Sequence, residues 1–171
     1  MSRLRCLVIG FVSIVMVAFA SGVQAQEACP SSKTLPEMMK ALDAAISGPS
    51  DKDRTCLRSL FLPDATLTVM MTDKSGVVKP VHLSVDDWIE RVKKRGSAPM
   101  YERQIKFVTE SYGNIAHLWS LYEIHETPDG PMKTRGVNSI QALNDGAQWK
   151  VVEVLWQAET PNTPIPAELM P

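Results

Sequence analysis

The sequence predicts an α+β domain in which helices cover one face of an antiparallel sheet. Three observations lead to this prediction. Three segments of the first half carry apolar residues at helical spacing, and four long segments of the second half have the composition of strands. Short turn sequences join those strands, which favours antiparallel neighbours. With 171 residues, 44 % of them hydrophobic, the chain fits one globular core.

The helices are bounded by recognisable start and stop signals. Thr34 and Glu37 form a capping-box pattern before a helix that Gly48 and Pro49 should end. A second, shorter helix is expected from about residue 54 to Phe61, closed by Pro63. A third helix should begin after Ser84 and end at Gly96.

Strands are expected between and after these helices. Residues 65–71 and 77–83 alternate in character around a turn at 73–76, and Pro80 favours an edge position for the second of them. The other strands are predicted at 101–111, 115–126, 132–143 and 148–158. Residues 26–159 should therefore form one domain. The proline-rich segment 160–171 is expected to run as an extended arm, either over a partner subunit or loose in solvent.

Residues 1–25 have the pattern of a secretory signal peptide. Arg3 and Arg5 precede an uncharged apolar run of 15 residues, and Val23 and Ala25 suit signal peptidase. The run is shorter than the roughly 20 residues that cross a bilayer, so we expect cleavage after Ala25 and no stable membrane span. The expected location is secreted or periplasmic.

The two remaining cysteines, Cys29 and Cys56, are candidates for a disulfide in such a compartment. Five extended residues reach about 17 Å, and a helix of 12 residues spans about 18 Å. The segment before the first helix can therefore run back along it to Cys56. The alternative is two free thiols, with Cys56 in the core.

The charge balance gives no sign of nucleic-acid binding. The chain has 18 Lys and Arg against 19 Asp and Glu, a formal net charge of −1. Proteins that bind nucleic acid usually show a basic excess or stripe.

Several local sequences, together with the order of elements, resemble the nuclear transport factor 2-like superfamily and its SnoaL-like exported bacterial members. They are residues 57–65, 85–88, 135–139 and 149–156. The resemblance implies a cone-shaped fold in which a curved sheet and three helices enclose a pocket, and a homodimer formed through the outer sheet face. The superfamily includes isomerases, dehydratases, hydrolases and binding proteins, so the fold alone does not define a function.

Matching the strands of that superfamily directs a set of side chains toward the pocket. The candidate ligand-binding residues are Tyr122, Arg135, Ser139, Trp156 and Arg103. Val137, Ser120, Ile105 and Phe107 are expected to face the same way, and Trp119, Leu121 and Leu155 to face outward. A pocket arginine would suit a ligand with an acidic group. The alternative is a purely structural role, in which Arg135 pairs with Glu123 or Glu102 and Tyr122 and Trp156 fill the core.

Known catalytic groups of the superfamily are missing from the matching positions. The ketosteroid isomerase base would fall at Val69 and its second aspartate at Ser139, and the first helix contains no tyrosine. The histidines expected of a scytalone dehydratase site do not match either, because His117 and His125 have the opposite strand parity. Those two histidines lie about 26 Å apart along a strand, too far to share a metal ion.

These observations favour a protein that binds a small hydrophobic or amphipathic molecule, with no cofactor and no metal. One alternative is an enzyme of isomerase, dehydratase or hydrolase type that uses Tyr122 as an acid. The other is an interaction module that acts through Trp119 and Leu121 on the outer face. An inward carboxylate or histidine near Tyr122 would favour the enzyme.

Overall fold

A computed structural model of the chain describes residues 29–96 and 98–171. The signal peptide predicted for residues 1–25 lies outside the described residues. The described part contains helices α1 (Leu35–Ile46), α2 (Thr55–Ser59) and α3 (Val85–Lys93), the short 3₁₀ helix η1 (Ala167–Leu169), and strands β1 (Phe61–Thr72), β2 (Val78–Leu83), β3 (Tyr101–Tyr112), β4 (Ile115–His125), β5 (Met132–Asn144) and β6 (Trp149–Ala158). This order confirms the predicted α+β class.

Reciprocal side-chain caps begin the two longer helices. The Thr34 hydroxyl accepts from the Glu37 amide at 3.3 Å, and the Glu37 carboxylate accepts from the Thr34 amide at 3.1 Å. Ser84 and Asp87 make the same pair of contacts at the start of α3. Each cap satisfies backbone donors that the first helical turn leaves without a partner.

The second helix ends earlier than its apolar spacing predicts, because Phe61 already pairs with Val151 of β6. The pairing of β1 with β6 is irregular between Phe61 and Thr66. Pro63 lies inside this irregularity, where a missing N–H costs no ladder hydrogen bond. The proline therefore marks a bulge in a strand and not the end of a helix.

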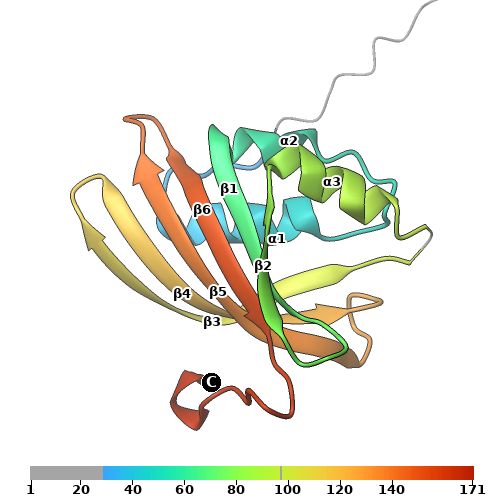
Figure 1. Cartoon of the computed structure of the whole chain (residues 1–171). Coiled ribbons are helices and arrows are strands. Elements are labelled where there is room, and N and C mark those ends of the chain that lie inside the picture. The colour runs from blue at the N-terminus through green and yellow to red at the C-terminus, as the bar shows by residue number, and fades with distance from the viewer. Residues whose placement is uncertain (1–28, 97) are drawn as a thin grey trace, which may run out of the picture.

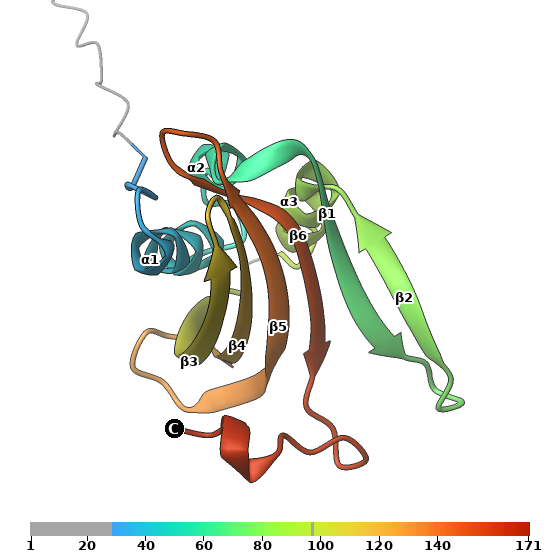
Figure 2. The ribbon, with the colours of Figure 1, turned by 90° about the vertical axis from the view of Figure 1, so that its left-hand side faces the viewer.

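The strands form one curved sheet in the order β2-β1-β6-β5-β4-β3. All neighbours are antiparallel except β1 and β6, which run parallel. The expectation of a wholly antiparallel sheet is wrong at this one pair, because the last strand enters between β1 and β5. The helices lie over the concave face, and the C-terminal segment lies on the opposite side of the sheet (Figures 1 and 2).

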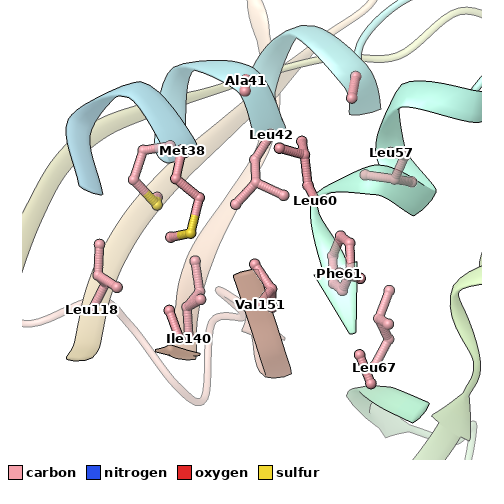
Figure 3. Packing of buried hydrophobic residues seen from close by; sticks show 14 of the residues in the cluster. Met38, Ala41, Leu42, Leu57, Leu60, Phe61, Leu67, Leu118, Ile140 and Val151 are labelled. Atoms are coloured by element: carbon pink, nitrogen blue, oxygen red, sulfur yellow. The ribbon is translucent and has the colours of Figure 1, made fainter. Parts of the chain in front are cut away.

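The hydrophobic core lies between α1 and the concave face of the sheet. Met38 and Leu42 of α1 point toward Leu118 and Ile140 of the sheet (Figure 3), and all four are at most 3 % exposed. Burial of such side chains contributes about 1.5–3 kcal/mol each. This packing holds α1 over β4 and β5.

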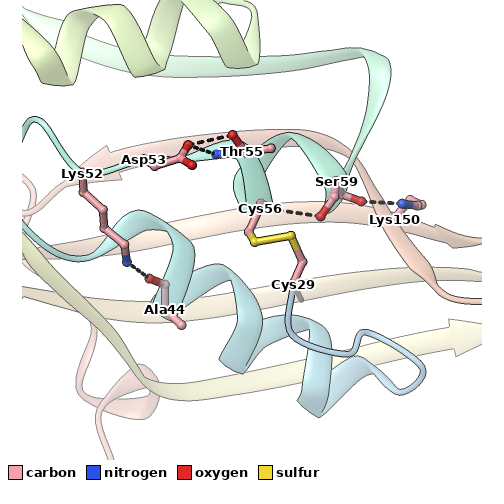
Figure 4. The surroundings of a disulfide bond; sticks show 8 residues. All are labelled: Cys29, Ala44, Lys52, Asp53, Thr55, Cys56, Ser59 and Lys150. Atoms are coloured by element: carbon pink, nitrogen blue, oxygen red, sulfur yellow. Dashed lines mark hydrogen bonds between the residues drawn. A yellow bond between two sulfur atoms is a disulfide. The ribbon is translucent and has the colours of Figure 1, made fainter. Parts of the chain in front are cut away.

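A disulfide joins Cys29 to Cys56 of α2, with a Cα–Cα distance of 5.2 Å (Figure 4). The backbone carbonyl of Cys56 accepts from the Ser59 hydroxyl at 2.7 Å. The segment before α1 therefore returns to α2, as its reach allowed, and the two cysteines are not free thiols in this structure.

The C-terminal residues 160–171, here called the strap, turn back across the outer sheet face. Thr160 and Thr163 exchange backbone hydrogen bonds of 3.0 and 3.3 Å in a tight turn, and η1 follows. The Lys106 ammonium group on β3 donates to the backbone carbonyls of Glu168 and Met170 at 3.0 and 2.6 Å. The expected extended arm is thus replaced by a strap held on the chain's own sheet.

Candidate functional site

The concave side of the cone contains a cavity of about 110 Å³. Its walls are mostly apolar and come from all three helices and from five strands. The apolar residues that line it are Leu42, Ile46, Leu57, Phe61, Leu67, Trp88, Met100, Ile124, Ile140, Val154 and Trp156. A cavity of this volume holds several water molecules or a small organic group.

One end of the cavity is polar. Glu102 and Gln104 of β3, Tyr122 of β4 and Asn138 of β5 line it together. The Gln104 side-chain amide donates to Glu102 Oε1 at 3.1 Å, and the Asn138 amide approaches the same oxygen at 3.5 Å. The cavity therefore combines apolar walls with one hydrogen-bonding end, the pattern typical of small-molecule sites.

Asp43 of α1 supports this polar end from outside the cavity. Its carboxylate accepts from the Gln104 backbone amide and from the Gln104 side chain, both at 3.0 Å. The Ser120 hydroxyl donates to the carbonyl oxygen of the same side chain. Gln104 is thus held on both sides, and its orientation determines how Glu102 is presented.

Burial raises the pKa of Glu102 to about 7, and the nearby Asp43 carboxylate adds to the increase. Hydrogen bonds from Gln104 and Asn138 act in the opposite direction but do not cancel it. Burial also raises the pKa of Asp43 itself. Near neutral pH, the Glu102 carboxyl group exists in both protonation states and is able to donate as well as accept a hydrogen bond.

Tyr122 lies against the backbone of β5, where Gly136 is its direct cross-strand partner. A Cβ atom at Gly136 would collide with the Tyr122 phenol and with the Gln157 backbone carbonyl. Burial raises the pKa of Tyr122, and the negative charge of Glu102 raises it further. The phenol therefore stays protonated, with Glu102 close enough to act on it electrostatically.

A bulge in β3 decides which residues enter the cavity. Gln104 is opposite Tyr122, but Lys106 is opposite Leu121, so Ile105 is an extra residue in β3. On one side of the bulge Glu102 and Gln104 face inward, and on the other side Phe107 pairs with inward Ser120. Such a bulge reverses the parity of a strand.

Of the five candidate residues, the structure brings Tyr122 and Trp156 together in the cavity wall. The expectation that Arg135, Ser139 and Arg103 face the pocket is wrong. Trp156 is opposite Asn138, and Tyr122 is opposite Gly136, so the even-numbered residues of this part of β5 face inward. Val137, also expected inside, lies with Ser139 on the outer face.

Each displaced candidate has a partner on the outer face. Arg135 binds Glu159 through two hydrogen bonds of 2.6 and 3.1 Å, and this contact raises its pKa. This partner is neither of the two carboxylates expected from the sequence.

The other two make weaker contacts. Ser139 and the His117 ring lie 3.0 Å apart. Arg103 is 3.4 Å from Glu123, and its side chain is half exposed. Trp119, Leu121 and Leu155 face outward, as predicted.

Sequence reasoning missed Glu102, Gln104 and Asn138. In a strand read without a bulge, polar residues at alternate positions indicate a solvated face. The signal that could have found them is the pair Glu102 and Gln104, which share the parity opposite to Arg103.

No metal centre and no membrane-crossing helix occur in the described residues. Within 29–96 and 98–171, no three His, Cys, Asp or Glu side chains lie close enough to hold an ion together. No helix in those ranges is both long and apolar enough to span a bilayer.

Comparisons with known proteins find structural neighbours only, since no family model and no curated protein matches. A nuclear transport factor 2-like protein of unknown function from Shewanella baltica aligns with a TM-score of 0.53 and 14 % identity, over 74 % of this chain and 91 % of that one. A putative ketosteroid isomerase from Parabacteroides distasonis aligns with a TM-score of 0.51 and 18 % identity, over 78 % of this chain and 98 % of that one. The chain has the nuclear transport factor 2-like fold.

A third neighbour with this fold is the β subunit of a putative aromatic-ring-hydroxylating dioxygenase from Novosphingobium aromaticivorans. Its TM-score is 0.56 and its identity 16 %, over 77 % of this chain and 94 % of that one. The nuclear transport factor 2-like fold thus occurs in proteins with different roles, and at such identities the likeness defines the fold alone. The cone that the sequence predicted is confirmed, and the site must be interpreted from its own residues.

Proposed function

We propose that this protein is exported and binds a small amphipathic molecule in its cone, with the polar group of that molecule at Glu102 and its apolar part against Trp88 and Trp156. The observation that carries the proposal is the cavity of about 110 Å³ with one hydrogen-bonding end. The disulfide supports the exported location, because such bonds persist mainly in oxidising compartments.

The polar end favours a neutral group on the ligand, such as a hydroxyl or a carbonyl. Glu102 and the supporting Asp43 are carboxyl groups, so a ligand anion would be repelled there. Arg95 is the one cation among the residues that line the cavity, and it is exposed to solvent. The acidic ligand that the sequence suggested depended on Arg135, which lies on the other face of the sheet.

Native mass spectrometry tests the binding proposal. The chain is expressed with its own leader in an exporting host, so that intact mass also reports whether cleavage follows Ala25. We expect an added mass of a small molecule on the intact chain. Val154→Phe, which fills the cavity, should abolish this signal.

The matched control is Gln141→Phe, an exposed position on the outer face of β5. It should bind as the unmodified chain does. Binding that survives Val154→Phe, or no binding of any kind to the unmodified chain, would contradict the proposal.

A second candidate function is acid–base catalysis in the same cavity. The observation that favours it is an inward carboxyl group with a pKa of about 7 next to the Tyr122 phenol. A base with this pKa operates efficiently at neutral pH. Proton abstraction beside a carbonyl group is the reaction class that suits these two groups.

Deuterium exchange distinguishes the two candidates. Small ketones are incubated with the protein in D₂O, and loss of their α-proton signals is followed by NMR. An enzyme should accelerate the exchange with a pH dependence centred near 7, and Glu102→Gln should remove the acceleration. Glu110→Gln, an exposed position further along β3, serves as the control. No acceleration with any ketone leaves the binding function in place.

A further inference from the structure

The outer face of the sheet contains a second hollow, larger than the cone cavity. Its volume is about 280 Å³, and it lies between the strap and strands β1, β4, β5 and β6. The apolar residues that line it are Met70, Trp119, Val137, Leu155, Trp156, Ala158, Pro164, Ile165, Pro166 and Leu169. Trp119 and Leu155 are each 41 % exposed. We call this hollow the strap groove.

Polar contacts hold the strap at both ends, so the groove is a built feature and not a gap beneath a loose chain end. At one end the Glu159 carboxylate binds Arg135 and also accepts from the Ile165 amide at 2.9 Å. At the other end Lys106 holds two strap carbonyls. Between these anchors the strap bridges the sheet without filling the space below it.

The charges around the groove are distributed unequally. Glu159 is neutralised by Arg135, whereas the hydrogen-bond partners of Lys106 among the described residues are two uncharged carbonyls. A smaller hollow shares Trp119, Val137 and Leu169 with the groove and reaches Lys106. The end of the groove at Leu169 therefore lies beside an ammonium group that has no carboxylate partner in the described part of the chain.

We propose that the strap groove binds a medium-chain alkyl carboxylate, with its hydrocarbon chain between the strap and the sheet and its carboxylate at Lys106. The volume suits such a molecule, because an apolar cavity of roughly 150 Å³ already holds benzene. The groove and the cone cavity share Trp156 and no other lining residue, and the proposal does not depend on the function proposed for the cone.

Titration calorimetry with decanoate and decan-1-ol tests the proposal on the full chain expressed with its own leader. Both ligands should bind with one site per chain, because the cone cavity of about 110 Å³ is too small for a ten-carbon chain. Val137→Phe, which fills the groove from the sheet side, should lower the affinity for both ligands by at least about tenfold, equivalent to about 1.4 kcal/mol. Lys106→Met should lower the affinity for decanoate by about fivefold, as expected for an exposed ion pair, and leave the affinity for decan-1-ol unchanged.

The neighbouring residue of β5 supplies a matched control. Asn138→Leu alters the cone and not the groove, so decanoate affinity should remain as in the unmodified chain. Leu155→Trp is a second groove-filling variant, to be used if Val137→Phe does not fold, as judged by circular dichroism.

Three results would overturn the proposal. The first is no heat of binding at millimolar decanoate. The second is loss of binding in Asn138→Leu but not in the groove variants, which would place the ligand in the cone. The third is an absence of ligand heat in a chain that sediments as a dimer and becomes monomeric on Val137→Phe, which would make a second copy of this chain the occupant.

Discussion

Replacement of Glu102 by glutamine should stabilise the protein at alkaline pH and have little effect at acid pH. The carboxyl group has a pKa of about 7 in the folded chain and an ordinary value of 4.5 when unfolded. Between these two values the folded state binds more protons than the unfolded state. The free energy of unfolding therefore falls as the pH rises through this window.

The magnitude follows from the two pKa values. Each unit of difference corresponds to about 1.4 kcal/mol. The interval from 4.5 to about 7 thus gives a cost of up to about 3 kcal/mol, fully present above pH 7. Glutamine keeps the acceptor oxygen that Gln104 and Asn138 use, but it carries no charge, so it resembles the protonated acid.

Urea unfolding followed by tryptophan fluorescence at pH 4.5 and pH 8 measures this effect. We expect the Glu102→Gln variant to exceed the unmodified chain by about 2–3 kcal/mol at pH 8 and to match it at pH 4.5. Glu110→Gln, at an exposed position of the same strand, should change stability by under about 0.5 kcal/mol at both pH values. An equal effect of Glu102→Gln at both pH values would refute the reasoning, because it would show that the carboxyl group is not held in a desolvated site.

Other perturbations test the fold and the assembly. Replacing both Cys29 and Cys56 by serine removes a bridge between residues 27 positions apart and should lower the free energy of unfolding by about 3.5 kcal/mol. Reductant should have the same effect on the unmodified chain and no effect on this double serine variant. Gly136→Ala should lower the free energy of unfolding by about 1–3 kcal/mol, measured by thermal melting. Adding Tyr122→Phe to this variant should restore only part of the lost stability, because the Gln157 backbone carbonyl also blocks the new methyl group. Leu118→Ala, at a fully buried site, should cost about 2–5 kcal/mol in the same assay. The homodimer expected through the outer face stays a prediction that sedimentation equilibrium tests; a monomer at all concentrations would contradict it.

The sequence by itself determined the parts of this protein that depend on local chemistry. The capping boxes at Thr34 and Ser84 placed the starts of two helices, because a side chain and a backbone amide three residues apart meet without help from the rest of the chain. Alternation and turns located all six strands, although β1 begins at Phe61, earlier than expected. The reach of the chain allowed the bridge between Cys29 and Cys56.

Tertiary structure decided which side chains of those strands enter the cone. A single extra residue, Ile105, reverses the parity of β3 and brings Glu102 and Gln104 inside. Similarly, the pairing of β5 with β4 and β6 turns Asn138 inward and Arg135 outward. A shift by one residue exchanges the two faces of a strand, and hydrophobic spacing alone does not specify it where both faces are partly apolar.

Local sequence patterns also could not predict the contacts between segments that are distant in the chain. Arg135 is paired with Glu159, 24 residues further along the chain, because the strap leaves β6 beside it. The strap lies on the sheet because Lys106 meets its carbonyls from 62 and 64 residues away. The identity of the polar residues in the site could therefore be found only after the sheet register and the path of the C-terminal segment were known.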